Sequence, residues 1–154
     1  MPRGRTRQAG RDDLDTFFFS SGSTGEPKGG MLSHLSINSN VEGAAQVIHI
    51  DHTDRALGIL PFFHSFGYML LWFYARHNSG IVFHPSPLDV GAIGELCSRY
   101  RIWLLVVTPT FLKLYQRRCT PEKFSKLRVV LTGAEKLPLS LMHPFHDRCD
   151  SKSV

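Results

Sequence analysis

The sequence predicts an α/β fold, with a mostly parallel sheet and flanking helices. Short apolar segments with strand character alternate with helix-like segments of about ten residues, which is typical of successive β-α-β units. Crossovers between such strands are right-handed, so the helices pack back onto the sheet. A chain of 154 residues fits one domain and is long enough to bury a core.

The first expected elements are a strand at 16–20 and a helix at 33–48. The strand is apolar, is expected to be buried, and leads directly into a glycine-rich segment. Ser33 is the expected N-cap of the helix, which has a rough apolar stripe between Leu35 and Ile48. Because this helix begins just past the glycine-rich segment, its amino terminus is expected to favour a bound anion.

The remaining elements alternate regularly. Strands are expected at 56–60, 80–84, 102–107 and 128–132, and helices at 65–76, 90–100, 110–118 and 139–148. Pro144 is expected to kink or end the last helix. Four turns directly follow strands, namely the segment after Phe19 and residues 61–64, 108–109 and 133–135. Because ligands gather beyond the carboxyl ends of parallel strands, these turns are expected to converge on one edge.

Residues 20–29 have the composition of a phosphate-binding loop. Glycines let the backbone approach a ligand closely, and successive N–H groups in such turns can form an anion-binding concavity. Ser21, Ser23 and Thr24 add hydroxyl donors. Lys28 adds a positive point charge suited to phosphate.

Two common glycine motifs do not match this loop. In the pattern G-x-x-x-x-G-K-S/T, Pro27 would occupy the second glycine position, and Gly29 would stand in place of Ser or Thr. No G-x-G occurs in the loop either. The plainer interpretation is a flexible Ser/Gly linker. The apolar run before the loop and the helix-like segment after it argue against a linker.

Two further segments contain candidate site residues. Residues 60–67 place His64 at a strand-to-helix turn among aromatic side chains. A histidine there can lie at the mouth of an apolar pocket, although a lone histidine in an apolar segment is more often structural. Residues 131–138 have the pattern of a strand followed by a turn of small residues, which alone is an ordinary loop.

Residues 20–29 resemble the phosphate-loop signature of the adenylate-forming superfamily, which includes acyl-CoA synthetases, luciferases and peptide-synthetase adenylation domains. The signature is roughly S/T-S-G-S/T-T-G-x-P-K-G, and the whole segment matches it. Gly30, just after it, is a mild departure, because a small β-branched residue is usual there. A second family segment, P-x-F-H-x-x-G, matches at Pro61, Phe63, His64 and Gly67. Over residues 17–148 the chain most resembles long-chain fatty acyl ligases, especially acyl–acyl-carrier-protein synthetases.

This resemblance implies part of the large domain of an adenylate-forming enzyme, which activates a fatty acid or another carboxylic acid. In the family, the carboxylate attacks the α-phosphate of ATP, giving an acyl-adenylate and pyrophosphate, and a thiol then takes the acyl group. ATP and Mg²⁺ are the implied cofactors, and coenzyme A or an acyl carrier protein is the implied thiol acceptor. No nucleic-acid partner is implied, and peripheral membrane association would come through the acyl substrate.

The resemblance also assigns roles to individual residues. Lys28 and His64 are the implied catalytic residues, and Thr24 is the implied metal-binding residue. The implied cofactor-binding residues are Ser20, Ser21, Gly22, Ser23, Thr24, Gly25, Lys28, Gly29, Gly133, Ala134 and Glu135. Four aromatic residues are expected either to line an acyl channel or to form ordinary core: Phe63, Phe66, Tyr68 and Trp72.

Residues 14–149 are expected to form a partial AMP-binding (adenylation) domain, between a disordered basic leader at 1–13 and a tail at 150–154. The family's Tyr-Gly-x-Thr-Glu segment, its ribose-binding aspartate and its mobile C-terminal domain have no counterpart in the sequence. The chain is therefore expected to be an internal slice that is incomplete as an enzyme by itself. The alternative is a non-catalytic nucleotide- or acyl-binding remnant or a regulatory module.

Composition argues against other classes of protein. The net charge is +5, but four arginines lie in the first eleven residues, and without them 14 basic residues face 13 acidic ones. Such a body does not favour nucleic-acid binding. The apolar stretch 59–75 is shorter than the roughly 20 residues that a membrane-spanning helix needs. Three widely spaced cysteines without a C-x-x-C pattern favour reduced thiols and a cytoplasmic location.

Overall fold

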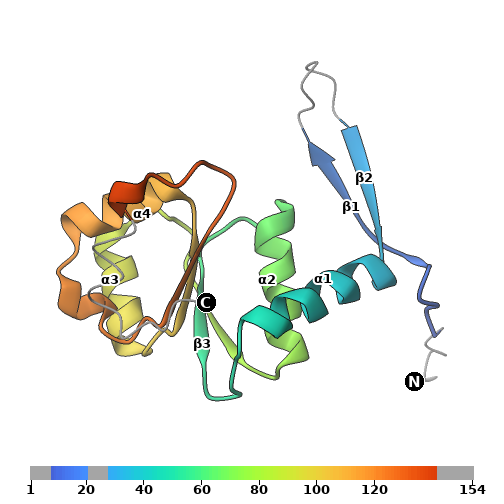
Figure 1. Cartoon of the computed structure of the whole chain (residues 1–154), viewed down its shortest axis with the longest axis horizontal. Coiled ribbons are helices and arrows are strands. Elements are labelled where there is room, and N and C mark those ends of the chain that lie inside the picture. Colours follow the sequence, from blue (N-terminus) through green and yellow to red (C-terminus); the bar gives the residue numbers. More distant parts are fainter. Residues whose placement is uncertain (1–7, 21–27, 142–154) are drawn as a thin grey trace, which may run out of the picture.

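A computed structural model describes residues 8–20 and 28–141, with only the backbone of Ser20. A helix-flanked parallel sheet forms the main body, and a separate β-hairpin stands beside it (Figure 1). The strands are β1 (Leu14–Ser20), β2 (Lys28–Ser33), β3 (Arg55–Gly58), β4 (Gly80–Phe83), β5 (Leu104–Val107) and β6 (Val129–Thr132). The helices are α1 (His34–Val47), α2 (Ser65–Arg76), α3 (Val90–Arg99), α4 (Pro109–Arg118) and the short 3₁₀ helix η1 (Pro121–Phe124).

The main sheet is parallel throughout and has the strand order β4-β3-β5-β6. Every residue of the central strand β5 is buried, which explains its unbroken apolar sequence. The predicted α/β fold with a parallel sheet is confirmed. The observed helix bounds of α2, α3 and α4 agree with the expected ones to within one residue.

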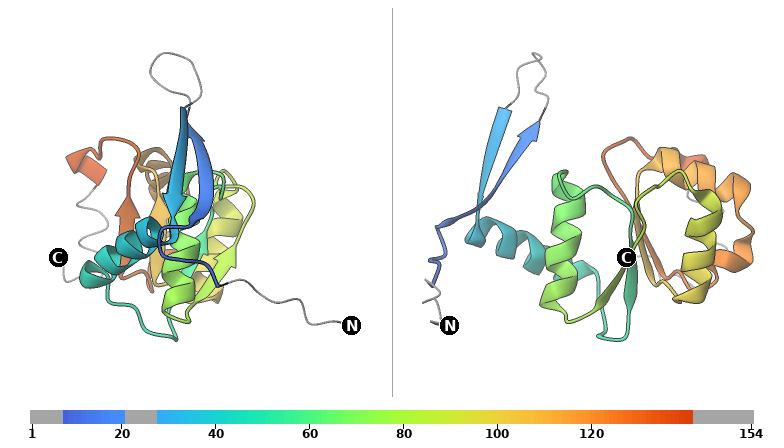
Figure 2. Two further views of the ribbon diagram at one scale, coloured as in Figure 1. Left: turned by 90° about the vertical axis from the view of Figure 1, so that its right-hand side faces the viewer. Right: turned by 180° about the vertical axis from the view of Figure 1, so that it is seen from behind.

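The two faces of the sheet are covered by different helices (Figure 2). Successive residues of β5 alternate between the two cores, as the period of two in a strand requires. Leu104 and Val106 pack in the core formed with α1 and α2, whereas Leu105 and Val107 pack in the core formed with α3 and α4. The result is a three-layer sandwich with a core on each side of the sheet.

The topology creates a switch point between β3 and β5. These strands are neighbours, yet α2 follows β3 on one face of the sheet and α4 follows β5 on the other face. The connections therefore lead away from each other and leave a crevice beyond the carboxyl ends of these two strands. In open α/β sheets, such crevices bind ligands.

The strand expected at 16–20 forms, but its environment differs from the prediction. It belongs to β1, which pairs antiparallel with β2 in a separate hairpin rather than joining the main sheet. Phe17 and Phe19 are 53% and 76% exposed instead of buried. The strand β2 was not expected because glycines weaken strands. The hairpin compensates by placing the Phe19 ring over Gly29, where an added Cβ would lie 3.5 Å from the ring.

The helix α1 begins where predicted, although it does not border the phosphate loop. The hydroxyl of Ser33 accepts a hydrogen bond from the Ser36 N–H at 3.2 Å, so Ser33 is the N-cap. Lys28 and this cap are the first and last residues of β2, so they lie at opposite ends of a six-residue strand. The expectation that the helix dipole supports anion binding at the loop is therefore wrong.

The last expected helix, at 139–148, begins at Leu139, but most of it lies outside the described residues. Among the described helices, none combines the length and the apolar character that crossing a bilayer would require.

Candidate functional site

Three of the four turns that follow strands meet at the switch-point edge. The turn after β6 is joined to the start of α4, because the Glu135 carboxylate accepts hydrogen bonds from the Thr110 N–H at 3.2 Å and from the Thr110 hydroxyl at 2.6 Å. Thr108, the residue before α4, provides no side-chain cap, so Glu135 serves this helix end from another loop. Ala134 has a left-handed backbone (φ 68°), which directs the turn back toward α4.

The turn after β6 also contacts the start of α2. A Cβ at Gly133 would lie 3.0 Å from the Phe66 ring, so glycine allows this close approach. The predicted convergence is thus present in the segments after β3, β5 and β6. The carboxylate of Glu135 binds the amino-terminal end of α4, a contact that the sequence pattern did not indicate.

His64 is the N-cap of α2. Its ring Nδ1 accepts a hydrogen bond from the Phe66 N–H at 3.3 Å, and its backbone N–H donates to the carbonyl of Pro61. Because Nδ1 accepts the bond from Phe66, the proton of the neutral ring is on Nε2, which remains available as a donor. The imidazole is exposed at the edge of the sheet.

The surrounding motif has a steric basis. A Cβ at Gly67 would overlap the carbonyl oxygen of Pro61 and lie 2.9 Å from that of Leu60. Glycine at this position therefore lets the first turn of α2 fold back tightly onto the segment after β3. The P-x-F-H-x-x-G pattern thus encodes a compact turn that holds His64 at the helix end.

An apolar cavity of about 500 Å³ lies between α1, α2 and the sheet. Ser65 and Phe66, which directly follow His64, belong to its lining. Leu131 of β6 and Val106 of β5 also line it, and α1 contributes Ile37 and Val41 among others. The cavity thus extends from the switch-point edge into the layer between the helices and the sheet.

The four aromatic residues expected to line an acyl channel do not share one cavity. Phe66 faces the apolar cavity, with Met69 and Phe73 from the same side of α2. Tyr68 and Trp72 are four residues apart, and their rings lie 6.1 Å apart on another side of the helix. Phe63 is 83% exposed. The helical period decides this division, because it separates residue 66 from residues 68 and 72.

Tyr68 connects the hairpin to the main body. Its ring meets Phe18 edge-to-face at 5.2 Å, and its hydroxyl donates to Asp15 Oδ2 at 2.8 Å. The other carboxylate oxygen of Asp15 lies 2.9 Å from Nδ1 of His34, and only 9% of the Asp15 side chain is exposed. One acidic residue in β1 thus joins the hairpin to both α1 and α2. The sequence contained one signal for this contact, namely a carboxylate beside the apolar residues of a strand. Carboxylates are seldom buried unless they are paired, so a partner for Asp15 was to be expected.

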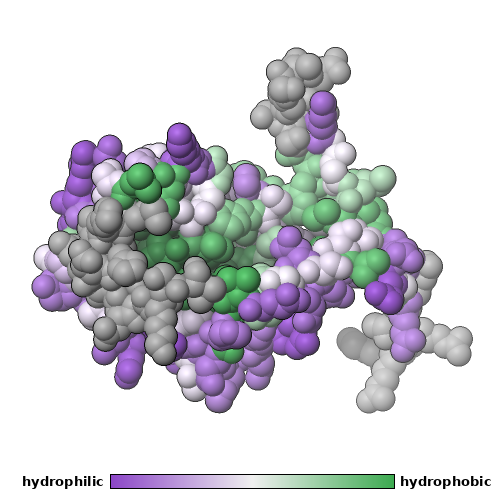
Figure 3. Space-filling model, in the orientation of Figure 1, coloured by the Kyte–Doolittle hydropathy of each residue, from purple (hydrophilic) through white to green (hydrophobic). Residues whose placement is uncertain are grey.

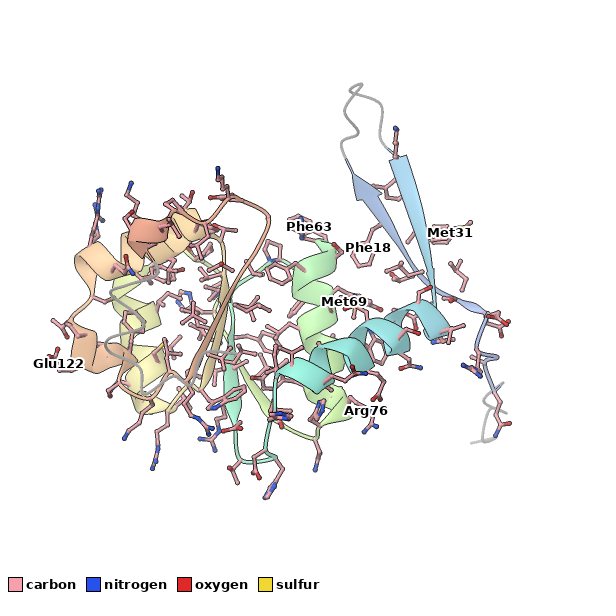
Figure 4. The ribbon with its side chains drawn as sticks, viewed as in Figure 1. Phe18, Met31, Phe63, Met69, Arg76 and Glu122 are labelled. Atoms are coloured by element: carbon pink, nitrogen blue, oxygen red, sulfur yellow. The ribbon has the colours of Figure 1, made fainter. Side chains whose placement is uncertain are left out.

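The hairpin faces the segment after β3 across a second hollow. This hollow has a volume of about 400 Å³, and its lining includes Phe17, Phe18, Phe62, Phe63 and Tyr68. Figure 4 shows Phe63 at the upper end of α2 and Phe18 between this helix and the hairpin. Hydrophobic residues also cover much of the hairpin surface (Figure 3). The segment bearing His64 is therefore the part of the sheet edge that approaches the hairpin.

The structure describes only part of the predicted phosphate loop. Lys28 begins β2 opposite Ser20, and Gly29 follows it in the strand. The other predicted phosphate-binding residues lie outside the described residues: Ser21, Gly22, Ser23, Thr24 and Gly25. The same holds for Thr24 as the predicted metal-binding residue.

The described residues contain no cluster of three or more His, Cys, Asp or Glu side chains that could hold a metal ion. The described residues could therefore hold Mg²⁺ only where phosphate oxygens supply most of the ligands, as is usual at nucleotide sites. The buried hydroxyl of Thr108, at the switch point, has no hydrogen-bond partner in the described part of the chain.

Comparison with known proteins identifies the family. The AMP-binding enzyme family matches residues 3–154. The chain belongs to the AMP-binding enzyme family. This membership confirms the resemblance drawn from the phosphate-loop signature.

Among its relatives is a feruloyl-CoA synthase from an Amycolatopsis species, which is 30% identical over 144 residues, or 90% of this chain and 29% of the relative. The 4-coumarate–CoA ligase 3 of Arabidopsis thaliana is 28% identical over 96% of this chain and 27% of the relative. The chain therefore spans less than a third of the length of these AMP-binding relatives. Their names refer to feruloyl and coumarate groups, so the fatty acid remains a prediction.

Solved structures agree with the fold. The N-terminal domain of FACL13 from Mycobacterium tuberculosis, in an inhibitor-bound crystal structure, has a TM-score of 0.82 and 26% identity over 94% of this chain and 37% of that one. An ATP-bound RpMatB-BxBclM chimera has a TM-score of 0.83 and 25% identity over 94% of this chain and 28% of that one. The chain thus has a fold found in both of these solved structures.

Proposed function

We propose that this chain takes part in the ATP-dependent activation of an apolar carboxylic acid to an acyl-adenylate, which is then transferred to a thiol. The observation that carries the proposal is the arrangement of the switch-point edge. There, His64 caps α2, the next two residues line an apolar cavity, and the Gly133 turn packs against Phe66. A polar edge that leads into an apolar cavity suits a ligand with a carboxylate head and a hydrophobic body.

The roles of the site residues follow from their chemistry. Lys28, with the hydroxyls and backbone N–H groups of residues 20–25 and Gly29, would neutralise the phosphates as pyrophosphate leaves. Thr24 would help to hold Mg²⁺, and Gly133, Ala134 and Glu135 would lie beside the adenine. The Nε2–H of His64 would orient the substrate carboxylate. Positioning and charge stabilisation account for most of the catalysis in this scheme.

The acid, its acceptor and the setting are part of the same proposal. The cavity of about 500 Å³ is large enough for a medium-sized apolar acid, either a fatty acid or an aromatic acid. The names of the relatives favour coenzyme A as the thiol acceptor, with an acyl carrier protein as the second candidate. We place the reaction in the cytoplasm, with any membrane contact made through the acyl substrate. The site belongs to a partial AMP-binding domain at 14–149, flanked by a leader at 1–13 and a tail at 150–154.

The alternative is a module that binds nucleotide or acyl groups without catalysis. The phosphate-loop sequence and the apolar cavity support it equally, because they imply that ligands bind and do not by themselves imply turnover. Both candidates require nucleotide binding at the phosphate loop, and only the first requires turnover.

ATP binding and ATP–pyrophosphate exchange test the two candidates together. We expect the chain to bind ATP and Lys28→Ala to weaken binding by about tenfold or more, because a charge-assisted contact to phosphate is lost. Lys113→Ala removes the same charge from an exposed position on α4 and is the matched control. Acid-dependent exchange that falls in Lys28→Ala supports activation. ATP binding without exchange, over a panel of fatty and aromatic acids, supports the binding module. A folded chain that does not bind ATP contradicts both.

A further inference from the structure

A further cavity, which is polar, lies at the opposite edge of the sheet from the switch point, where the strands begin. Its volume is about 500 Å³, and eight residues line it, of which four are basic: Arg55, Arg101, Lys126 and Arg128. Asp54 is its one carboxylate. Figure 4 shows nitrogen-tipped side chains along this lower edge, and the surface there is hydrophilic in Figure 3. The cavity is therefore strongly cationic.

The charges of this cavity are not balanced within the described part of the chain. Asp54 already accepts a hydrogen bond from the Asp51 N–H at 2.8 Å. None of the four basic side chains forms an ion pair with a described acidic residue. Elsewhere on the surface, by contrast, Arg76 pairs with Glu42 at 3.0 Å. Four neighbouring cations beside a single described carboxylate repel one another, and a bound anion would relieve that repulsion.

Two of the arginines are held in place by the fold. The Arg128 guanidinium lies 5.6 Å above the centre of the Trp103 ring, a cation–π arrangement that fixes its position. Arg55 donates from Nη1 to the Tyr100 carbonyl at 3.4 Å, which leaves its other donors available. Both retain planar forks that match phosphate oxygens.

Cations also collect at the carboxyl ends of helices, because the helix dipole favours them there. That effect accounts for Arg101, which follows the C-cap Tyr100 of α3. It does not account for Arg55 and Arg128, which lie where β3 and β6 begin. Three separate segments thus bring basic residues to one cavity.

We propose that this cavity binds a phosphate-bearing anion at a site separate from the phosphate loop. The four cations recognise phosphate oxygens, and Arg55 and Arg128 do so through guanidinium forks. The phosphate group belongs either to a soluble phosphate ester or diphosphate, or to a phospholipid headgroup. This site lies across the sheet from the switch point, so its occupation does not require the activation reaction.

Trp103 is a built-in reporter of the site. The chain contains two tryptophans, and Trp72 is the other one. In Trp72→Phe, fluorescence therefore comes from Trp103 alone, beneath the Arg128 guanidinium. We expect a saturable change in the Trp103 fluorescence when inorganic pyrophosphate is added at constant ionic strength. Because the site does not involve the phosphate loop, we expect the same fluorescence change in the double variant that combines Trp72→Phe with Lys28→Ala.

Two substitutions and a control identify the cavity. Arg101→Gly and Lys126→Gln together should weaken pyrophosphate binding by about tenfold or more, since charged hydrogen bonds are lost. Arg101 has a left-handed backbone (φ 52°), a conformation that glycine adopts readily, so this change should not impair folding. Lys113→Gln, on the exposed side of α4, removes a charge away from the cavity and should leave affinity within about twofold. Circular dichroism verifies that all variants fold.

A second probe separates the two sources of phosphate. Vesicles of phosphatidylglycerol are compared with neutral phosphatidylcholine vesicles by sedimentation. Pyrophosphate binding that the double variant abolishes supports a soluble phosphate ligand. Binding to the anionic vesicles alone, again lost in the double variant, supports a lipid headgroup. If neither probe binds, or if the double variant binds like Lys113→Gln, the proposal is wrong.

Discussion

At the scale of single residues, the observed task of His64 can be separated from its proposed one. Its Nδ1 caps α2 through the Phe66 N–H at 3.3 Å, whereas the proposed catalytic contact uses Nε2. Asparagine is among the best N-cap residues, and its short side chain cannot reproduce the Nε2 donor position. Substitutions at this residue can therefore distinguish a structural histidine from a functional one.

We expect His64→Ala to lower the free energy of unfolding by about 1 kcal/mol and His64→Asn to preserve most of it, because only the second retains the cap. Both changes should reduce any acid-dependent exchange to a similar extent. Urea unfolding followed by circular dichroism measures the first effect. If His64→Asn retained full exchange, His64 would be a cap and nothing more.

At the scale of elements, the position of the hairpin depends on Asp15 and Tyr68. Their hydrogen bond of 2.8 Å joins β1 to α2, and the Phe18–Tyr68 ring contact adds to it. Because Lys28 begins the second strand of this hairpin, the same contacts determine where Lys28 lies relative to the sheet. A change at Tyr68 should therefore affect the proposed nucleotide site through the position of Lys28.

Tyr68→Phe should lower the free energy of unfolding by about 1.5–3 kcal/mol, because it leaves a largely buried carboxylate with one partner fewer. Asp15→Ala should cost at least as much, because it also removes the contact with His34. The double variant should cost clearly less than the sum, since both single changes remove the same bond. A double-mutant cycle in urea measures this coupling. Strict additivity would mean that the hairpin is held mainly by its ring contacts.

At the scale of the whole molecule, both cores hold groups that resist ionisation. Burial raises the pKa of Cys97 to about 12, and burial also raises the pKa values of Tyr74 and Tyr115. In the unfolded chain these groups ionise near their ordinary pKa values of about 8.5 for cysteine and 10 for tyrosine. Above those values the folded state keeps protons that the unfolded state has released, so stability falls as pH rises.

The free energy of unfolding should accordingly decrease between about pH 9 and pH 12. Thermal unfolding followed by circular dichroism at a series of pH values measures this decrease. In Cys97→Ala the loss near pH 9 should be smaller but should not disappear, because burial also raises the pKa of Cys119. A stability that stays constant up to pH 11 would show that these side chains are accessible to water in the folded protein.

The sequence by itself determined the parallel α/β sheet and most of its elements. Alternation of apolar strands with helical periods is a local property, and prolines and Ser33 mark element ends within a few residues. The expected helix at 65–76 therefore coincides with α2. The segments that contain Lys28 and His64 were also recognisable, because both resemble signatures of the adenylate-forming superfamily.

Only the tertiary structure decided what each element packs against. The sequence of β1 is apolar on both faces, and nothing local shows that its partner is the glycine-containing β2 rather than a strand of the main sheet. Likewise, the bond between Asp15 and Tyr68 and the cap that Glu135 provides for α4 join residues 53 and 25 positions apart. Periodicity indicates which residues share a face, whereas the partner of that face depends on how distant segments are brought together. The physical reason is that packing free energy comes from contacts between segments, and no single segment contains that information.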